Sequence, residues 1–355
     1  MRIAFVNSTK IWSGVKTWML EFGDELRRLG DEPHYFASDA RFIEAVRAAG
    51  HQAVLLRFGF DYHPGTIARF WREFRRRGIQ VACLNIQKEL RSAGIAARLS
   101  GIPVVHRVGL AGDLTGKWDQ RLAYRTVVSR VLVPSATLRQ ELLSAHAFLA
   151  PGRVFAIPNG KHVSGRVRAC KGAPVRFAMA SRLERTKRHA DVLDALGALA
   201  RDPALPAFLL DIHGDGSEEA ALHRQIEALG LGARVRMLGF TRNLPESLAN
   251  CDFGVLASEQ EGMPNTALEF LAAGLPVVAT DTGGTAEAVR PAINGWLFRP
   301  GDGNALRAHL RACLTLPDGE YARMSAGAIA LMRDEFDPAR LAVRLHHFFA
   351  ETERK

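Results

Sequence analysis

The chain has 355 residues, of which 47% are hydrophobic and 24% charged, a composition typical of globular domains and unlike disordered, collagen-like or coiled-coil chains. At about 100–200 residues per domain, this length predicts two or three domains. No apolar run approaches the roughly 18 residues of a membrane-spanning helix, and the first residues lack a signal-peptide core. We therefore expect a cytoplasmic protein. Its four cysteines are scattered without a Cys-x-x-Cys pair, which argues against zinc and redox sites.

The net charge of +10 is concentrated in the first part of the sequence. Residues 1–150 hold 22 Lys and Arg against 13 Asp and Glu, whereas the remaining residues hold 25 against 24. A basic half predicts an anionic partner for that half. The ordinary alternative, a lineage that uses arginine freely on solvated faces, stays open.

Short apolar strands alternate with amphipathic helices along the first half, which is the pattern of a parallel sheet covered on both faces. We expect strands at Arg2–Val6, Val54–Arg57, Val81–Asn85, Val104–Arg107, Arg130–Val133 and Val154–Ile157, and helices at Lys16–Leu29, Thr66–Arg77, Glu89–Leu99, Asp119–Val128 and Ser135–Leu143. The stretch from Asn159 to Pro174 is rich in glycine and positive charge and has no hydrophobic periodicity. It predicts a domain boundary.

The alternation restarts after this boundary. We expect strands at Val175–Ala180, Phe208–His213, Val235–Leu238, Phe253–Ala257 and Val277–Thr280, and helices at His189–Leu199, Glu218–Leu229, Leu244–Asn250 and Asn265–Ala273. The sequence thus predicts an α/β protein with two Rossmann-like, doubly wound parallel-sheet domains, at residues 1–160 and 161–337. The last segment, 338–355, contains an apolar helical pattern at Pro338–Thr352, and we expect it to pack back on the first domain.

Arg182 and Lys187 follow the strand that ends at Ala180, in a loop just ahead of a predicted helix. Ligands of doubly wound sheets bind outside the carboxyl ends of the strands. A helix N-terminus flanked by a guanidinium and an ammonium group favours a phosphate there. The alternative for this segment alone is a solvated basic turn.

The loop after the strand at Phe253–Ala257 carries Glu261 and enters a helix that carries Glu269. We expect Gly262 and Pro264 to shape this turn so that backbone N–H groups point outward at the helix N-terminus. A carboxylate in this position suits a hydroxyl-rich ligand, because it accepts strong hydrogen bonds from sugar hydroxyls. Either acid alone would equally well complement the helix dipole.

A third loop, Gly214-Asp215-Gly216, has Gly-x-Gly spacing, but Glu219 stands where the dinucleotide fingerprint needs its third glycine. We therefore expect no nicotinamide cofactor. The P-loop pattern and any Asp-x-Asp are also absent from the sequence. A diphosphate neutralised by Arg182 and Lys187 is favoured over one held by a metal, and we expect neither a metal nor a cofactor.

Together these motifs resemble the retaining nucleotide-sugar glycosyltransferases of family 4, also called glycosyltransferases group 1. The resemblance is strongest over residues 154–300. The motifs that carry it are Ile157-Pro158-Asn159-Gly160, Ser181-Arg182-Leu183 with Lys187, Gly214-Asp215-Gly216, Glu261-Gly262-x-Pro264 followed by Glu269, Gly274-Leu275-Pro276-Val277-Val278-Ala279-Thr280, and Gly283-Gly284.

The resemblance implies the GT-B fold, in which two Rossmann-like domains face each other across a cleft. It implies a retaining, metal-independent hexosyl- or glycosyltransferase whose donor is a nucleotide-diphosphate sugar and whose acceptor is a glycan or glycolipid. The expected setting is the synthesis of cell-envelope polysaccharide, in particular a lipopolysaccharide core.

The resemblance also implies a role for each matching residue. Arg182 and Lys187 would hold the diphosphate as it leaves, Glu261 would bind hydroxyls of the transferred sugar, and Glu269 would bind the ribose. His106 would lie near the donor sugar, although a lone histidine at a strand end is more often structural.

Gly14 would approach the diphosphate, although Ser13 stands where a second glycine is common. Base contacts are implied near Phe240–Leu244. The backbone would supply the remaining donor contacts at Gly262, Met263, Pro264, Asn265 and Thr266.

The basic first half suggests an anionic acceptor. The helix expected at Thr66–Arg77 carries Phe70, Trp71 and Phe74 on one side and arginines around the rest. Such a helix can lie on an anionic membrane, which would place the protein peripherally on the inner face of the cytoplasmic membrane. The ordinary alternative is that its apolar face lies in the domain core.

Two other functions stay open. A nucleotide-sugar epimerase of the same fold would also bind a diphosphate-linked sugar. A non-enzymatic protein that binds nucleic acid or another anionic surface would use the basic half alone. No recognisable nucleic-acid module is present, so we expect no nucleic-acid partner.

Overall fold

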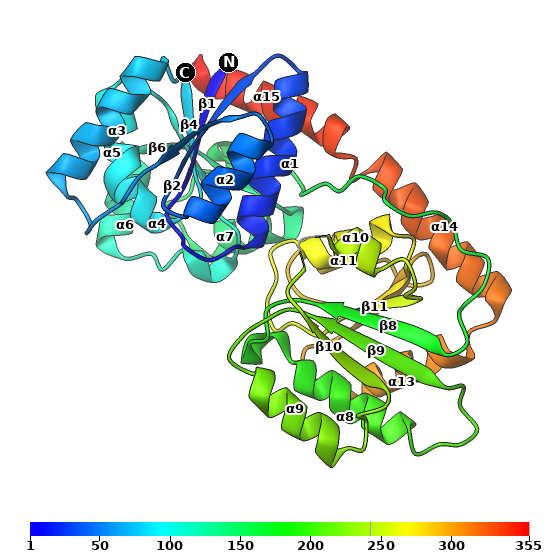
Figure 1. Ribbon diagram of the computed structural model, residues 1–355. Coiled ribbons are helices and arrows are strands. Elements are labelled where there is room, and N and C mark those ends of the chain that lie inside the picture. Colours follow the sequence, from blue (N-terminus) through cyan, green and yellow to red (C-terminus); the bar gives the residue numbers. More distant parts are fainter. Residues whose placement is uncertain (242, 355) are drawn as a thin grey trace. The chain divides into compact units, whose positions relative to one another are not determined.

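The computed structural model describes residues 1–241 and 243–354. They form two compact units, one that joins Met1–Asn159 to the described residues from Pro338 onward, and one that comprises Gly160–Asp337 (Figure 1). Each unit has its own parallel β-sheet and its own buried core. The predicted α/β class, with two Rossmann-like parallel-sheet domains, is confirmed.

The described residues of the N-terminal unit form a seven-stranded sheet in the order β3-β2-β1-β4-β5-β6-β7, and all neighbouring strands pair in parallel. The chain reverses its direction of travel across the sheet between β3 and β4, which makes the carboxyl ends of β1 and β4 a switch point of the doubly wound type. The strands are β1 (Arg2–Asn7), β2 (Glu32–Ala37), β3 (Gln52–Leu55), β4 (Val81–Leu84), β5 (Val104–Arg107), β6 (Val128–Val133) and β7 (Val154–Ala156).

The helices that cover this sheet come from both ends of the chain. Leu345 and Phe349 of the last helix lie in one buried cluster with Trp18 and Phe22, so α15 lies beside α1 (Figure 1). The helical elements are α1 (Gly14–Arg28), α2 (Ala40–Ala48), α3 (Pro64–Arg77), α4 (Gln87–Glu89), the π-helical turn η1 (Leu90–Gly94), α5 (Ile95–Leu99), η2 (Ala111–Asp113), α6 (Trp118–Thr126), α7 (Ala136–Ala145), η3 (Pro151–Arg153) and α15 (Pro338–Glu353).

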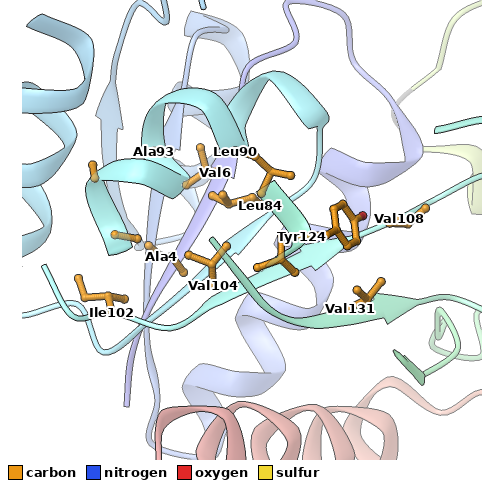
Figure 2. Close-up of a cluster of buried hydrophobic side chains, with 14 of the residues drawn as sticks. Ala4, Val6, Leu84, Leu90, Ala93, Ile102, Val104, Val108, Tyr124 and Val131 are labelled. Carbon is orange, nitrogen blue, oxygen red and sulfur yellow. The ribbon is translucent and has the colours of Figure 1, made fainter. Parts of the chain in front are cut away.

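The other face of the N-terminal sheet carries a second buried cluster. Figure 2 shows Val6, Leu84 and Val104 from three strands of the sheet together with Leu90. Phe70 and Phe74 of α3 belong to the same cluster and are fully buried, so the apolar face of α3 lies in the core, as the ordinary alternative for this helix expected. Its exposed residues include Arg69, Arg72, Arg75 and Arg76.

The C-terminal unit has a six-stranded sheet within the described residues, in the order β10-β9-β8-β11-β12-β13, again with parallel pairs throughout. The strands are β8 (Val175–Ala180), β9 (Phe208–His213), β10 (Val235–Gly239), β11 (Phe253–Leu256), β12 (Val277–Thr280) and β13 (Gly295–Phe298). The helical elements are η4 (Arg185–Lys187), α8 (His189–Leu199), α9 (Glu219–Ala228), α10 (Leu244–Ser247), α11 (Asn265–Ala272), α12 (Thr285–Ala288), α13 (Gly303–Thr315) and α14 (Asp318–Asp334).

Several elements differ from the sequence-based expectation. The strand β2 and the helix α2 were not predicted. The first residues of β2 are Glu32 and Pro33, which are depleted in strands, although every residue of β2 after Glu32 is buried. The strand expected at Val54–Arg57 begins two residues earlier, and the helix expected at Glu89–Leu99 contains the π-helical turn η1. After Thr280, the elements α12, β13, α13 and α14 were likewise missed.

Candidate functional site

Three loops of the C-terminal unit meet at the carboxyl ends of the neighbouring strands β9, β8 and β11. Leu183, after β8, donates its N–H to the carbonyl of Asp215, after β9, over 2.8 Å. On the other side, Glu259 donates its N–H to the carbonyl of Thr186 over 2.9 Å. The three predicted motifs therefore lie together at the edge of the sheet where doubly wound folds bind their ligands.

Gly214 allows the loop after β9 to approach the loop after β8. Its φ is +146°, and a Cβ at this position would overlap the carbonyl oxygen of Ser181. Only glycine combines this conformation with such a close backbone approach. The first glycine of the Gly-x-Gly pattern thus packs two loops of the protein against each other.

Lys187 and Glu261 form an ion pair across two of these loops. Lys187 lies in η4, just before α8, and its Nζ is 2.6 Å from Oε1 of Glu261. The side chains are 24% and 13% exposed, so the pair is partly desolvated but open to solvent. Partial desolvation strengthens the interaction relative to bulk water. The structure therefore brings two of the predicted catalytic residues into direct contact.

Arg182 pairs with a residue that the sequence analysis did not single out. Its Nη2 lies 2.6 Å from Oε1 of Glu184, and the two side chains are 46% and 39% exposed. Exposed ion pairs are worth about 0–1 kcal/mol. Arg182 can therefore exchange Glu184 for a phosphate, which accepts two parallel hydrogen bonds from a guanidinium, at little cost.

The turn into α11 is built largely from buried side chains. Met263 and Pro264 are buried, and Thr266 donates its hydroxyl to the carbonyl of Ala180, at the end of β8, over 2.8 Å. Pro264 occupies the N-cap position and makes no side-chain cap. These side chains shape the turn, and the donor contacts of the Gly262–Thr266 backbone stay a prediction.

Glu269 of α11 has a lysine partner that the sequence analysis missed. Its Oε1 lies 2.8 Å from Nζ of Lys161, whose side chain is only 7% exposed. The signal in the sequence was a single cation after Asn159-Gly160, in a segment interpreted as a boundary. A ribose would share this carboxylate with Lys161, and a carboxylate has about four lone-pair sites for such bonds.

His106 and Gly14 lie in the N-terminal unit. His106 is 1% exposed, and its Nδ1 lies 2.6 Å from the hydroxyl of Tyr124. Burial lowers the pKa of the imidazole to about 3, so the ring is neutral. This is the structural role that the ordinary alternative expected, while a role near the donor sugar stays a prediction. Gly14 is exposed as the first residue of α1.

Glu89 in α4 is fully buried, and the sequence analysis did not single it out. Its Oε1 accepts a hydrogen bond from the N–H of Ser8 over 2.6 Å, and its Oε2 accepts from Asn85 over 2.7 Å and from Ile86 over 3.1 Å. Burial raises the pKa of this carboxyl to about 7, against the effect of these backbone donors. Glu89 thus joins the loop after β1 to the loop after β4.

The raised pKa of Glu89 predicts a pH dependence of stability. The folded value of about 7 lies above the ordinary 4.5, so this group contributes stability that is complete below pH 4.5 and is lost as the pH rises through 7. At 1.36 kcal/mol per pKa unit, the loss between pH 4.5 and 8 is about 3 kcal/mol.

Urea unfolding of the wild type and of Glu89→Gln at both pH values measures this loss. The difference between the two chains removes the titrations of the histidines, which both chains share. We expect the wild type to lose more stability than the variant over this interval. An equal pH dependence in the two chains would contradict the role of Glu89.

Three further observations concern residues 1–241 and 243–354. No group of three or more His, Cys, Asp or Glu side chains in these ranges is arranged to hold a metal ion. No helix there is both long enough and apolar enough to cross a bilayer. In the segment expected near the nucleotide base, Phe240 is exposed, and residue 242 lies outside the described residues.

Both units match models of known protein families. Residues 12–163 match the model of Glycosyltransferase Family 4, and residues 168–330 match that of Glycosyl transferases group 1. The lipopolysaccharide core biosynthesis glycosyltransferase LpsE of Rhizobium meliloti is 32% identical over 164 residues, which are 46% of this chain and 45% of LpsE. The UDP-Gal:alpha-D-GlcNAc-diphosphoundecaprenol alpha-1,3-galactosyltransferase of Escherichia coli is 26% identical over 231 residues, 59% of each chain. The chain thus spans about half the length of these relatives.

Solved structures show the same fold. HepE of Anabaena in complex with UDP-glucose matches with a TM-score of 0.83 at 20% identity, over 99% of this chain and 100% of that chain. The lipopolysaccharide outer core galactosyltransferase WaaB, in its apo form, matches with a TM-score of 0.73 at 18% identity, over 98% and 100%. The chain thus combines a Glycosyltransferase Family 4 domain with a Glycosyl transferases group 1 domain, and its fold is that of the GT-B glycosyltransferases.

Proposed function

We propose that this protein transfers a sugar from a nucleotide-diphosphate sugar to a glycan or glycolipid acceptor, with retention of anomeric configuration, in the synthesis of lipopolysaccharide or another cell-envelope polysaccharide. The observation that carries the proposal is the contact of 2.6 Å between Lys187 and Glu261, beside Arg182 at the carboxyl edge of the C-terminal sheet. The activities named for LpsE and the E. coli galactosyltransferase, and the UDP-glucose bound by HepE, support it.

The charges of the candidate site suit a departing diphosphate. Arg182 and Lys187 offer fixed positive charge to oxygens on which negative charge grows as the sugar leaves. Glu261 holds Lys187 in place and has a second carboxylate oxygen for sugar hydroxyls, while Glu269 binds the ribose. In this proposal the two cationic side chains do the work of a metal ion, so the transfer needs none.

Retention follows from departure and attack on the same face of the sugar. The bond between the anomeric carbon and the diphosphate oxygen breaks, the acceptor oxygen bonds to that carbon, and the acceptor proton passes to a diphosphate oxygen. A double displacement would instead need a carboxylate free to attack carbon. Glu261 is engaged by Lys187 and is better placed to bind hydroxyls.

The stereochemistry of the product tests the proposal. A thermal-shift panel of nucleotide sugars identifies the donor first, since a ligand at 100 times its Kd stabilises by about 2.7 kcal/mol. We then expect the anomeric proton coupling of the product, measured by NMR, to match that of the donor. An inverted linkage would refute retention, and a trapped glycosyl adduct on Glu261 would refute the mechanism. Loss of activity in EDTA that Mg²⁺ restores would refute metal independence.

The same assay separates the proposal from its alternatives. An epimerase would convert the donor without an acceptor, and a binding protein would convert nothing. Neither alternative gains support from the relatives described above. The ion pair of Lys187 with Glu261 lies in the C-terminal unit, so it would not contribute to binding in a protein that uses only the basic N-terminal unit.

The acceptor side of the proposal rests on charge. The exposed arginines of α3, among them Arg72 and Arg75, make its outer face basic, which suits a phosphorylated or otherwise anionic acceptor. They also suit peripheral contact with an anionic membrane, at the cytoplasmic face where nucleotide sugars are available. Because Phe70 and Phe74 are buried, any such contact is made by the charges of α3 and by the partly exposed Trp71.

A further inference from the structure

One short segment after β4 contacts the loops that follow other strands of the N-terminal sheet. Oε1 of Gln87 accepts a hydrogen bond from Nε2 of Gln120, in α6, over 3.2 Å. Glu89 accepts one from Ser8, after β1. Arg91 continues the series in η1, so the alternate residues 87, 89 and 91 together contact the loop after β1, the segment before α3 and the helix α6. The segment therefore fixes the arrangement of loops at the carboxyl edge of this sheet.

Arg91 holds two carboxylates that are far apart in the sequence. Its Nη1 lies 2.5 Å from Oδ2 of Asp61, and its Nη2 lies 2.5 Å from Oδ2 of Asp119. Asp61 precedes α3 and Asp119 lies in the first turn of α6, so one guanidinium sets the spacing of two loops. A planar guanidinium suits this task because its donors have a fixed geometry, which the single ammonium of lysine lacks.

Exposed aromatic side chains stand next to both clamped aspartates. Phe60 and Tyr62, which flank Asp61, are 69% and 53% exposed, and Trp118, which precedes Asp119, is 78% exposed. Tyr62 also has a φ of +61°, which is unfavourable for a bulky residue and is retained mainly at functional sites. We call Phe60, Tyr62 and Trp118 the aromatic platform. Exposed aromatic side chains next to residues that one guanidinium holds together indicate a binding surface.

Two exposed lysines lie in the same segments as Trp118 of the aromatic platform and Arg91. Arg91 offsets one of the two negative charges of the clamped aspartates, and the carboxylate of Asp113 is occupied by hydrogen bonds from backbone N–H groups of its own turn. Lys88 and Lys117 are exposed and form no ion pair within the described part of the chain. The cations that remain open to pairing with a ligand are therefore these two lysines, which suit an anionic ligand.

We propose that the aromatic platform binds an anionic saccharide, with sugar rings stacked on Tyr62 and Trp118 and with Lys88 and Lys117 paired to its phosphate or carboxylate groups. Its role as the acceptor rests on the proposed function, whereas the binding itself does not. Aromatic rings offer broad apolar faces to the C–H faces of a sugar, and convergent polar groups fix its orientation. Contact with a lipid surface needs exposed apolar and basic groups but not the fixed spacing that Arg91 imposes.

Calorimetric titration tests this binding with a lipid-free lipopolysaccharide core oligosaccharide that carries phosphate groups, and with the same oligosaccharide after phosphatase treatment. We expect Trp118→Ala and Tyr62→Ala each to weaken binding about 5- to 10-fold. Arg91→Lys, which keeps the charge but not the double clamp, should weaken it as well, and so should removal of the phosphates. Leu99→Ala is the control, because it removes an exposed apolar side chain of the N-terminal unit outside the platform and should bind like the wild type.

Nucleotide binding is followed in the same variants as the thermal shift with the nucleotide that the donor panel identifies, and this shift should not change. Equal affinity of the wild type and Trp118→Ala for the phosphorylated oligosaccharide, or no saturable binding of either oligosaccharide, overturns the proposal. If the wild type binds phosphatidylglycerol vesicles but neither oligosaccharide, and Trp118→Ala abolishes the vesicle binding, the platform binds lipid instead of a saccharide. Failure of this proposal is distinguishable from failure of the proposed function. The proposed function fails if no nucleotide sugar is turned over, whereas the titration measures saccharide binding without turnover.

Discussion

Lys187→Ala is expected to lower turnover of the nucleotide sugar about 10²- to 10³-fold, the usual cost of removing one group that stabilises developing charge. The Nζ of Lys187 lies 2.6 Å from Glu261, so the substitution removes a cation and also releases the carboxylate that it holds. Arg182→Ala should fall in the same range, because its half-exposed guanidinium is free to exchange Glu184 for a phosphate. The measurement is kcat at saturating donor and acceptor.

Arg185→Ala is the matched control for both substitutions. Arg185 lies in the same loop, is exposed, and forms no ion pair among the residues that the structure describes. Its removal changes the loop charge by the same amount, and we expect a rate within about twofold of the wild type, because exposed charges contribute little. Wild-type rates in Lys187→Ala and Arg182→Ala would refute the leaving-group role. An equal loss in Arg185→Ala would reduce that role to general loop charge.

The ion pair also makes the contributions of its two members separable. Residues in contact give non-additive effects, which a double-mutant cycle measures. If Lys187 acts only by holding Glu261, the double variant Lys187→Ala with Glu261→Gln loses no more than Glu261→Gln alone. If Lys187 also contacts the diphosphate, the double variant loses more. The second result is the one that the proposed mechanism requires.

The strands of both sheets were largely predictable because buried parallel strands are continuous apolar runs. The exception β2 shows where this signal fails. Its first residues, Glu32, Pro33 and His34, read as a turn, yet β2 is buried because it pairs with β1 on one side and β3 on the other. Burial that arises from neighbouring strands leaves no mark in a short window of sequence. The strand β13 was missed because it has only four residues, Gly295–Phe298, and begins with glycine, which is depleted in strands.

The candidate site was likewise predictable only in part. The loops were predictable because a parallel sheet brings the carboxyl ends of its strands to one edge, whatever lies between them in the sequence. The contacts within and around them were not. Lys161 with Glu269, and Arg91 with Asp61 and Asp119, join residues that no common local pattern links. Such pairs depend on the distance between side chains from different elements, which only the folded chain defines.

Gly283→Ala is expected to lower nucleotide affinity and turnover about 10²-fold, although Gly283 follows β12 and is not among the residues expected to contact the donor. Its φ is +53°, and a Cβ there would overlap the carbonyl oxygen of Glu261 and crowd Gly262. The N–H of Gly284 donates to the carbonyl of Gly262 over 2.8 Å, which holds the two loops together. The alanine would therefore push the turn that carries Glu261 away from Lys187, and a misplacement of about 1 Å costs about 10²-fold in rate.

Gly230→Ala separates this displacement from plain destabilisation. Gly230 follows α9 in the same unit with a φ of +67°, and nothing lies within 4 Å of the position of its Cβ. It therefore carries the same left-handed backbone penalty of about 1 kcal/mol without the overlap. We expect Gly230→Ala to lose Tm but to keep the affinity for the donor nucleotide and kcat, while Gly283→Ala loses all three. Full activity in Gly283→Ala would mean that the turn between Glu261 and Gly262 tolerates displacement, and a turn that tolerates displacement cannot be the part of the chain that positions the donor.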